Sequence, residues 1–313
     1  MTEHVLQLVT DPEAFGHVGL VIGGSSAERE VSLNGGKSVS AALTRKKISH
    51  QVFDGPMALF KAVEQGHIDR VFNLLHGPDG EDGSLQGALQ LMDVPFTGAD
   101  LPSSALSMDK VRSKWVWERN GIPTPEFMCF DPGEDNFEEA LEVLGLPVFV
   151  KPVGLGSSIG VSKVTSEEAL LPAVSLAKTH GSKVIIEKEI VGGEYFAGVL
   201  KGQGLPLIRI ETPREFYDYT AKYESDETEY FCPCGLDENL EHELREQSMK
   251  AFALLGASGW GRVDFLLDAD GKPWFLEVNT TPGMTDHSLV PQAAAEIGIG
   301  FDELVWHILE TSL

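Results

Sequence analysis

The chain has 313 residues and a formal net charge of −24, and its apolar and charged fractions of 42% and 23% are ordinary for a soluble globular protein. This length predicts two or three domains with an ample hydrophobic core. The charge argues against binding to nucleic acid, whose phosphates require a basic face, and against binding to anionic membranes.

The sequence carries no targeting or membrane signal. No stretch reaches the roughly 18 consecutive apolar residues of a membrane helix, and the N-terminus lacks the basic and apolar regions of a signal peptide. Three cysteines, Cys129, Cys232 and Cys234, are too few for a disulfide framework. We interpret Cys232 and Cys234 as reduced thiols rather than a metal site, and we expect a cytoplasmic protein.

The first predicted element is a buried strand over 17–22, which ends in two glycines. Ser25 and Glu28 fit a capping box that opens a helix over about 27–43. Strand, glycine turn and helix are the usual start of a doubly wound α/β domain. The full dinucleotide-binding fingerprint is absent, so we infer no NAD site. From this pattern alone, Glu28 is more simply a helix cap than a ligand-binding group.

A second buried strand over 71–75 runs into a polar, glycine-rich segment that begins at His76. Ligands of open α/β sheets bind beyond the carboxyl ends of strands, so His76 is a candidate site residue. A structural histidine is the alternative, and the acids that follow could be turn and capping residues. After them the pattern predicts a helix over 85–92, an extended segment over 94–97 and a boundary at 98–102.

The pattern is helical over 103–119 and again over 137–144, before a strand over 146–151. Lys151 ends that strand and opens a glycine- and serine-rich loop that returns at 161–163. Glycines let backbone N–H groups approach an anion closely, and serine hydroxyls add donors, so this loop is a candidate phosphate clamp. It is not a Walker A loop, and a simple flexible loop is the alternative.

Further strands are predicted over 183–190, 195–200 and 207–211. The segment 216–226 is polar and aromatic without helix or strand periodicity, so we predict an ordered loop or lid. An acidic amphipathic helix follows over 239–255. Its inward-facing residues are predicted to be Leu240, Leu244, Met249, Phe252 and Leu255. The final residues predict two short scaffold helices.

The segment 259–288 carries the densest chemistry. Asp270 and Gly271 predict a two-residue type I′ turn, and counting outward places Asp264 opposite Glu277 and Arg262 opposite Asn279. Because strand side chains alternate in direction, these last four residues share one face. The opposite, apolar face is predicted to consist of Val263, Phe265, Leu267, Trp274, Leu276 and Val278.

The polar face of this hairpin suggests a metal site. Two carboxylates and an amide oxygen suit a hard cation such as Mg²⁺, and Arg262 can hold a developing negative charge beside them. Incidental ion pairs on a solvated sheet are the alternative. The cross-strand coincidence and the irregular tail at 279–284 favour the site.

Segments spread along the chain match one family. They are 23–32 (GGSSAEREVS), 76–83 (HGPDGEDG), 105–110 (ALSMDK), 151–160 (KPVGLGSSIG), 216–223 (FYDYTAKY) and 259–289. On these motifs the chain resembles the D-alanine–D-alanine ligases of the ATP-grasp superfamily, over almost its whole length from Val18 onward. The leader before His17 lies outside the match.

The resemblance implies an ATP-grasp fold of three domains that combines α/β and α+β architecture. The first would be a doubly wound α/β domain over 1–99 that binds the first D-alanine. A central α+β subdomain over 100–197 would carry the phosphate loop 151–160. The C-terminal subdomain over 198–313 would carry a lid loop at 213–230 and the Mg-binding hairpin at 259–283.

The resemblance also implies roles, residue by residue. The implied ATP-binding residues are Lys110, Lys151, Ser158, Glu187, Lys188, Ile190, Glu194, Phe216 and Lys222. Two Mg²⁺ ions, with Mn²⁺ able to substitute, would be bound by Asp264, Glu277 and Asn279. The implied substrate-binding residues are Val31, His76, Ser288 and Leu289, and the implied catalytic residues are Glu28, Ser157, Tyr223, Arg262 and Gly283.

The implied activity is ATP-dependent ligation of two D-alanines through an acyl phosphate, for peptidoglycan precursor synthesis, by a homodimer. The nearest alternative is another ATP-grasp ligase, such as one forming D-alanyl-D-lactate, and a non-catalytic nucleotide-binding regulator is more distant. Tyr223 matches dipeptide-forming members, whereas relatives that use D-lactate carry Phe there. Two departures from the common pattern, at 78–79 and 153–155, leave ATP affinity open without removing a named ligand.

Overall fold

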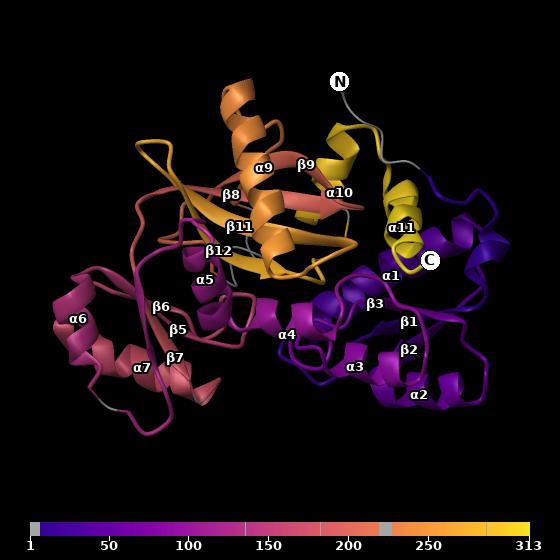
Figure 1. The fold of residues 1–313 in the computed structure, drawn as a ribbon, viewed down its shortest axis with the longest axis horizontal. Helices are drawn as coiled ribbons and strands as arrows, with labels where there is room; N and C mark the ends of the chain where they lie inside the picture. Colours follow the sequence, from indigo (N-terminus) through magenta and orange to yellow (C-terminus); the bar gives the residue numbers. More distant parts are fainter. Residues whose placement is uncertain (1–6, 135, 182, 219–226, 286) are drawn as a thin grey trace.

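The computed structural model describes residues 7–134, 136–181, 183–218, 227–285 and 287–313. They form three β-sheets, each covered by helices (Figure 1). Among the described residues, no helix is long and apolar enough to cross a membrane.

The N-terminal sheet is parallel, with strand order β2-β1-β3. Its elements are β1 (Val18–Ile22), α1 (Arg29–Arg45), β2 (His50–Asp54), α2 (Pro56–Glu64), β3 (Arg70–Asn73) and α3 (Ser84–Leu91), preceded by the 3-10 turn η1 (Pro12–Phe15). All five residues of β1 are buried because helices cover both faces. Leu20 packs in a core with Val39 of α1, and Val21 packs in another with Leu59 of α2. This confirms the predicted doubly wound domain.

The predicted capping box at the start of α1 is wrong. Glu28 precedes the first helical residue, but its side chain makes no capping hydrogen bond. Its backbone, at φ −94° and ψ 11°, is not extended as a capping residue requires. The carboxylate instead accepts a hydrogen bond from the hydroxyl of Ser157, 129 residues away. A long-range contact therefore replaces the local one.

The helix predicted over 103–119 is two helices, α4 (Leu101–Met108) and α5 (Lys110–Arg119). Asp109 between them is extended, at φ −86° and ψ 97°, and its carboxylate accepts a hydrogen bond from the backbone N of Arg112 at 2.9 Å. This N-cap starts α5 afresh and turns it away from α4. Both helices pack against β12 (Pro273–Asn279) of the C-terminal sheet.

The central sheet is antiparallel, with strand order β4-β7-β5-β6. Its strands are β4 (Phe127–Phe130), β5 (Val148–Pro152), β6 (Ser162–Val164) and β7 (Val184–Lys188), and its helical segments are α6 (Glu138–Leu144), η2 (Glu167–Ala169) and α7 (Leu170–Thr179). One core joins Val148 and Val150 of β5 with Ala173 and Ala177 of α7. The other face of the sheet is left for Lys151 and Glu187.

The C-terminal sheet is antiparallel, with strand order β10-β9-β8-β11-β12. Its elements are β8 (Gly192–Leu200), β9 (Gln203–Glu211), β10 (Glu229–Phe231), α9 (Glu238–Leu254), β11 (Trp260–Asp268), β12 (Pro273–Asn279), α10 (Leu289–Glu296) and α11 (Phe301–Glu310). Phe265 of β11 packs with Leu244 and Phe252 of α9, as the predicted helix face requires. On the opposite face, Phe196 of β8 shares a core with Val290 of α10 that continues into the N-terminal sheet.

The predicted hairpin pairing holds at the end nearest the polar cluster but not at the turn. Arg262 pairs with Asn279 and Asp264 with Glu277, whereas Phe265 pairs with Phe275 because the register shifts by one residue. The loop therefore has one residue more than predicted. A β-bulge at Leu276 compensates for it. As a result Phe275 lies in the core, and Leu276 lies on the polar face instead of the predicted apolar one.

Candidate active site

Two adjoining cavities lie where the three sheets meet. The first, of about 600 Å³, is enclosed by β5 and β7 of the central sheet and β8, β11 and β12 of the C-terminal sheet. The second, of about 670 Å³, lies between the start of α1, the loop 151–160 and the segment leading into α10. Lys110, Tyr217 and Glu277 line both cavities. A ligand in one cavity can therefore reach a ligand in the other.

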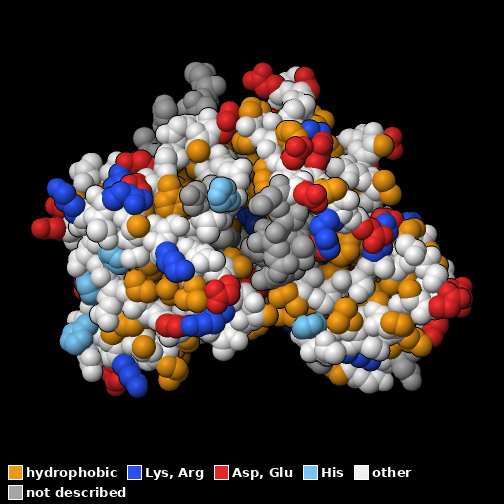
Figure 2. Space-filling model, turned by 180° about the vertical axis from the view of Figure 1, so that it is seen from behind, with side chains coloured by type: hydrophobic (Ala, Val, Ile, Leu, Met, Phe, Trp, Pro, Cys, Tyr) orange, Lys and Arg blue, Asp and Glu red, His pale blue; other side chains and the backbone are white. Residues whose placement is uncertain are grey.

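The face of the molecule seen in Figure 2 carries charges of both signs. In Figure 2, acidic and basic side chains are interspersed over the two lower lobes, which are separated by a recess. The buried charges are mixed as well, since Lys110 and Lys114 lie among buried carboxylates that include Glu187 and Asp264.

The hairpin brings its two carboxylates to the junction of the cavities. Arg262 holds Asp264 through two hydrogen bonds, Nε to Oδ1 at 2.6 Å and Nη2 to Oδ2 at 2.7 Å. Burial would lower the pKa of Arg262, but the charge of Asp264 raises it above its usual range. Lys110 Nζ lies 3.0 Å from Glu277 Oε2. Asn279, opposite Arg262, accepts a hydrogen bond from the backbone N of Thr281 through Oδ1 at 2.9 Å.

The wall of the first cavity contains a buried carboxylate between two lysines. Glu187 is 2% exposed; Lys151 donates to its Oε2, and Lys114 Nζ lies 3.0 Å from its Oε1. Burial would raise the pKa of Glu187, but the charges of Lys114 and Lys151 outweigh it and hold the pKa at about 2. Glu187 is therefore an anion at neutral pH. Its neighbours around the cavity are Lys188, Ile190, Glu194 and Phe216, all predicted ligand-binding residues.

The loop 151–160 covers both cavities. Ser157 and Ser158 have left-handed backbones, at φ 51° and 57°, which turn their hydroxyls in opposite directions. Ser157 donates to Glu28 in the second cavity, and Ser158 donates to the carbonyl oxygen of Tyr217 at 3.1 Å. Lys110 Nζ donates to the carbonyl oxygen of Leu155 at 2.5 Å. The loop is thus ordered by contacts to both neighbouring sheets.

The second cavity gathers the residues predicted to bind substrate, with one exception. Glu28 and Val31 line it from α1, while Gly283, Ser288 and Leu289 line it from the segment leading into α10. A Cβ atom on Gly283 would lie 3.0 Å from Ser288 Oγ, so a larger residue there would make the Ser288 side chain shift by a few tenths of an ångström.

His76 is the exception, because it is buried and does not line the second cavity. It is 4% exposed, and its Nδ1 lies 2.8 Å from the carbonyl oxygen of Leu74. Its Nε2 is buried and has no hydrogen-bond partner within the described part of the chain. Burial lowers the pKa of His76, so the ring is neutral at pH 7.

Two predicted residues, Lys222 and Tyr223, lie outside the described residues.

The structure brings several residues to the site that the sequence did not predict there. Tyr217 lines both cavities and is 7% exposed, and Glu81 lines the second. Burial and the nearby charge of Glu28 raise the pKa of Glu81 well above its usual range. Lys114 was also missed, although its spacing of four from Lys110 on one helix places both on the same face.

A parallel α/β domain, two antiparallel sheets enclosing a nucleotide-sized cavity, and a carboxylate hairpin beside a glycine-rich loop define an enzyme of the ATP-grasp class. Comparison with known proteins agrees. Residues 116–310 match the family model described as D-ala D-ala ligase C-terminus, and residues 50–99 match the one described as D-ala D-ala ligase N-terminus. The chain belongs to the D-alanine–D-alanine ligase family.

Individual relatives are similar over nearly their full length. A D-alanine–D-alanine ligase of Methylococcus capsulatus is 52% identical over 95% of this chain and 96% of its own. One of Chromohalobacter salexigens is 49% identical, with 97% and 98% covered. The solved ligase of Bacillus anthracis superposes with a TM-score of 0.84 at 36% identity, covering 95% and 97%. VanG, a D-Ala:D-Ser ligase of Enterococcus faecalis, gives 0.82 at 29%, covering 95% and 99%.

Proposed function

We propose that this chain catalyses the ATP-dependent ligation of two D-alanines to D-alanyl-D-alanine, releasing ADP and phosphate, as a step in peptidoglycan precursor synthesis. The relatives above carry this activity in their names, and a structure of the Bacillus anthracis ligase complexed with ATP superposes with a TM-score of 0.82. The observation that carries the proposal is the meeting of the two cavities at Lys110, Tyr217 and Glu277. A nucleotide in one can transfer a phosphoryl group to a carboxylate in the other.

The first cavity would hold ATP. Lys110 and Lys151 would contact its phosphates, together with Lys222, and Ser158 would cover them with the loop. Adenine and ribose would lie against Glu187, Lys188, Ile190 and Glu194. Leu266 and Leu276 line the same wall, and Phe216 meets Phe149 edge to face at 5.4 Å. These groups supply the apolar surface that a purine needs.

The hairpin residues fit Mg²⁺ in their donor chemistry. Asp264 and Glu277 are cross-strand partners that line the first cavity, and Asn279 follows two residues after Glu277. Two carboxylates and an amide oxygen, completed by phosphate oxygens, suit this hard cation. Within the described residues no cluster of three or more His, Cys, Asp or Glu side chains could hold a metal. Bound ions would neutralise phosphate charge during the transfer.

The metal proposal predicts that E277Q lowers turnover by at least about a thousandfold, because one of two ion-binding carboxylates is lost. The folded state should persist, since glutamine keeps the side-chain shape. Titration of Mn²⁺ in the presence of ATP, followed by electron paramagnetic resonance, should show weaker ion binding. E246Q, at an exposed position of α9, serves as the matched control and should change turnover less than twofold. Wild-type Mn²⁺ affinity in E277Q would remove the metal assignment.

The second cavity would hold the amino acids. Glu28 would take the ammonium group of the first D-alanine, with Val31 beside it and His76 behind. Ser288 and Leu289, at the N-terminus of α10, would hold the carboxylate of the second D-alanine, where backbone N–H groups favour an anion. The hydrogen bond from Ser157 to Glu28 would continue to Tyr223 as a triad that joins loop, lid and substrate.

The chemistry follows from these positions. The carboxylate of the first D-alanine attacks the γ-phosphorus of ATP, giving an acyl phosphate and ADP. The amine of the second D-alanine then attacks the acyl carbon, and phosphate leaves. Arg262 and the backbone N–H of Gly283 would stabilise the tetrahedral oxyanion. An acyl phosphate hydrolyses readily, so the loop 151–160 must exclude water while it exists.

The function is tested by measuring ADP release with D-alanine, with L-alanine, and with D-alanine plus D-lactate or D-serine. The products are identified by mass spectrometry. D-alanine-dependent release with a D-alanyl-D-alanine product supports the proposal. Release that requires D-lactate or D-serine would make this a ligase with a different second substrate and would contradict the interpretation of Tyr223. No release under any condition would favour the nucleotide-binding regulator.

We also propose the division into domains at 1–99, 100–197 and 198–313, a cytoplasmic location and a homodimer. The three sheets support the first boundary, which falls between β3 and β4, whereas the second cuts through β8, whose residues 192–197 pair with β11 of the C-terminal sheet. Sedimentation equilibrium tests the dimer.

A further inference from the structure

Lys114 is a buried charged residue outside the proposed binding machinery. Its side chain is 0% exposed, and in the described part of the chain it lines neither cavity. Burying an ammonium group is costly unless it is paired and hydrogen-bonded. Burial lowers the pKa of Lys114 to about 8 in spite of the nearby charge of Glu187. Such a group therefore needs an explanation beyond packing.

The contacts of Lys114 connect the two sheets that enclose the first cavity. Its Nζ donates to Thr124 Oγ1 at 2.6 Å, and Thr124 donates to the carbonyl oxygen of Phe275 in β12 at 2.8 Å. On the other side Nζ lies 3.0 Å from Glu187 Oε1 in β7. Lys110, one helical turn earlier in α5, pairs with Glu277 of β12. Helix α5 thus holds one carboxylate of each sheet.

The charges around Glu187 explain what this contact does. Two lysines and one glutamate leave one net positive charge, and of the three side chains only Lys151 is appreciably exposed, at 15% against 0% and 3%. Lys114 neutralises Glu187 from behind. Without Lys114, the buried carboxylate would keep Lys151 as its only ion-pair partner among the described residues and would draw it away from the cavity.

We propose that Lys114 is a positioning residue, which neutralises Glu187 so that Lys151 can present its charge to the phosphates of the nucleotide. The inference rests on the proposed function for the identity of that ligand. Lys114 itself touches no ligand. It acts through Glu187, and its effect must therefore depend on the charge of Glu187.

The test measures binding rather than turnover, with the non-hydrolysable analogue AMP-PNP and Mg²⁺ in a calorimeter. K114M should weaken binding about 10- to 100-fold, the worth of one charge-assisted contact. The KM for D-alanine should change less than twofold. K183M is the matched control, because Lys183 pairs with Asp131 at 2.6 Å on the surface of the same sheet, and it should bind like the wild type.

The double variant K114M/E187Q makes the test independent of folding defects. Removing the carboxylate removes the need for Lys114, so the double variant should bind AMP-PNP within threefold of E187Q alone. An equal loss on both backgrounds, or wild-type binding by K114M, would overturn the inference. Wild-type protein that binds AMP-PNP but makes no dipeptide would instead refute the proposed function and leave Lys114 as a positioning residue for another ATP-dependent reaction.

Discussion

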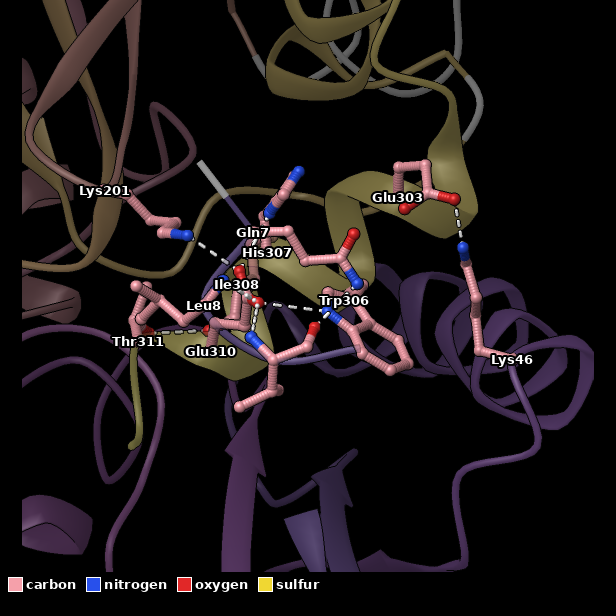
Figure 3. Close-up of polar contacts among 11 residues, drawn as sticks. Gln7, Leu8, Lys46, Lys201, Glu303, Trp306, His307, Ile308, Glu310 and Thr311 are labelled. Atoms are coloured by element: carbon pink, nitrogen blue, oxygen red, sulfur yellow. Dashed lines mark hydrogen bonds and ion pairs between the residues drawn. The ribbon is translucent and has the colours of Figure 1, made fainter. Parts of the chain in front are cut away.

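Glu187 and Glu310 are the same kind of residue in two regions of the molecule. Both are almost fully buried carboxylates, 2% and 1% exposed. Glu187 lies between two lysines in the wall of the first cavity. Glu310, near the end of α11, is surrounded by donors from three parts of the chain (Figure 3). Glu310 Oε1 lies 2.6 Å from the backbone N of Leu8, 3.0 Å from the backbone N of Val9 and 3.1 Å from Trp306 Nε1. Glu310 Oε2 lies 2.7 Å from Lys201 Nζ and 2.9 Å from His307 Nδ1.

The two clusters differ in what their partners face. Every donor around Glu310 belongs to the scaffold: the N-terminal leader, the turn after β8, and α11 itself. In the described part of the chain none of them lines either of the two cavities of the candidate active site. At Glu187, Lys151 lines the first cavity, whereas Lys114 lies on the other side of the carboxylate and lines neither cavity. A buried charge cluster is thus no sign of function by itself. What indicates a role in binding is a partner of the buried carboxylate that lines a cavity.

Two residues of the leader, which lies outside the matched motifs, take part in the cluster around Glu310. Leu8 and Val9 give their backbone N–H groups to Glu310, so residues 7–9 close the space over α11. Burial would raise the pKa of Glu310, but hydrogen bonds from Lys201, His307 and the two amides outweigh it and lower the pKa. Leu8 and Val9 therefore belong to the structural cluster.

Among the variants that test the difference between the Glu310 and Glu187 clusters, E310Q is expected to have the largest effect. A glutamine amide group would face at least one of the surrounding donors, so the free energy of unfolding should fall by about 3–5 kcal/mol. Urea denaturation measures the loss. The affinity of the folded protein for AMP-PNP should stay within twofold of wild type, in contrast with K114M. A tenfold loss of nucleotide affinity would show that Glu310 and the first cavity are coupled after all.

Acid should act on the same cluster with a defined sign. The pKa of Glu310 is lowered in the folded state from its ordinary value of 4.5, so the unfolded chain takes up its proton first as pH falls. This contribution to stability is present above pH 4.5 and is lost below it. Wild-type stability, measured between pH 6 and pH 3, should fall more steeply than that of E310Q. Parallel curves would mean that Glu310 has the same pKa in both states.

The sequence predicted those features that depend on neighbouring residues. Turn and strand patterns were enough to pair Asp264 with Glu277, since hairpin geometry is local. Even there the predicted turn was one residue too short. Asp264 still pairs with Glu277 because of the β-bulge at Leu276, which residue propensities do not predict. No element was predicted over residues 50–64, where the structure has β2 and α2.

Features that depend on distant residues could not be predicted. Glu28 fits a helix cap in its own segment, but in the fold the hydroxyl of Ser157 reaches it across 129 positions. Lys114 looks like any helix-surface lysine, because only packing of α5 between two sheets buries it. The resemblance to a family supplied roles for residues that line the two cavities, whereas the role of Lys114 behind Glu187 became visible only with the structure.

The smallest effect is expected from a pair next to the Glu310 cluster that lacks its burial. Lys46, which follows α1, contacts Glu303 of α11 (Figure 3), with side chains 23% and 47% exposed, and its Nζ lies 5.6 Å from the ring centre of Trp306. Because water screens such pairs, K46M should cost about 0–1 kcal/mol in the free energy of unfolding. Part of that difference should vanish in 1 M salt, where the screening length is about 3 Å. A loss as large as that of E310Q, unchanged by salt, would mean that the α1–α11 contact itself, and not the burial of Glu310, sets the stability of this region.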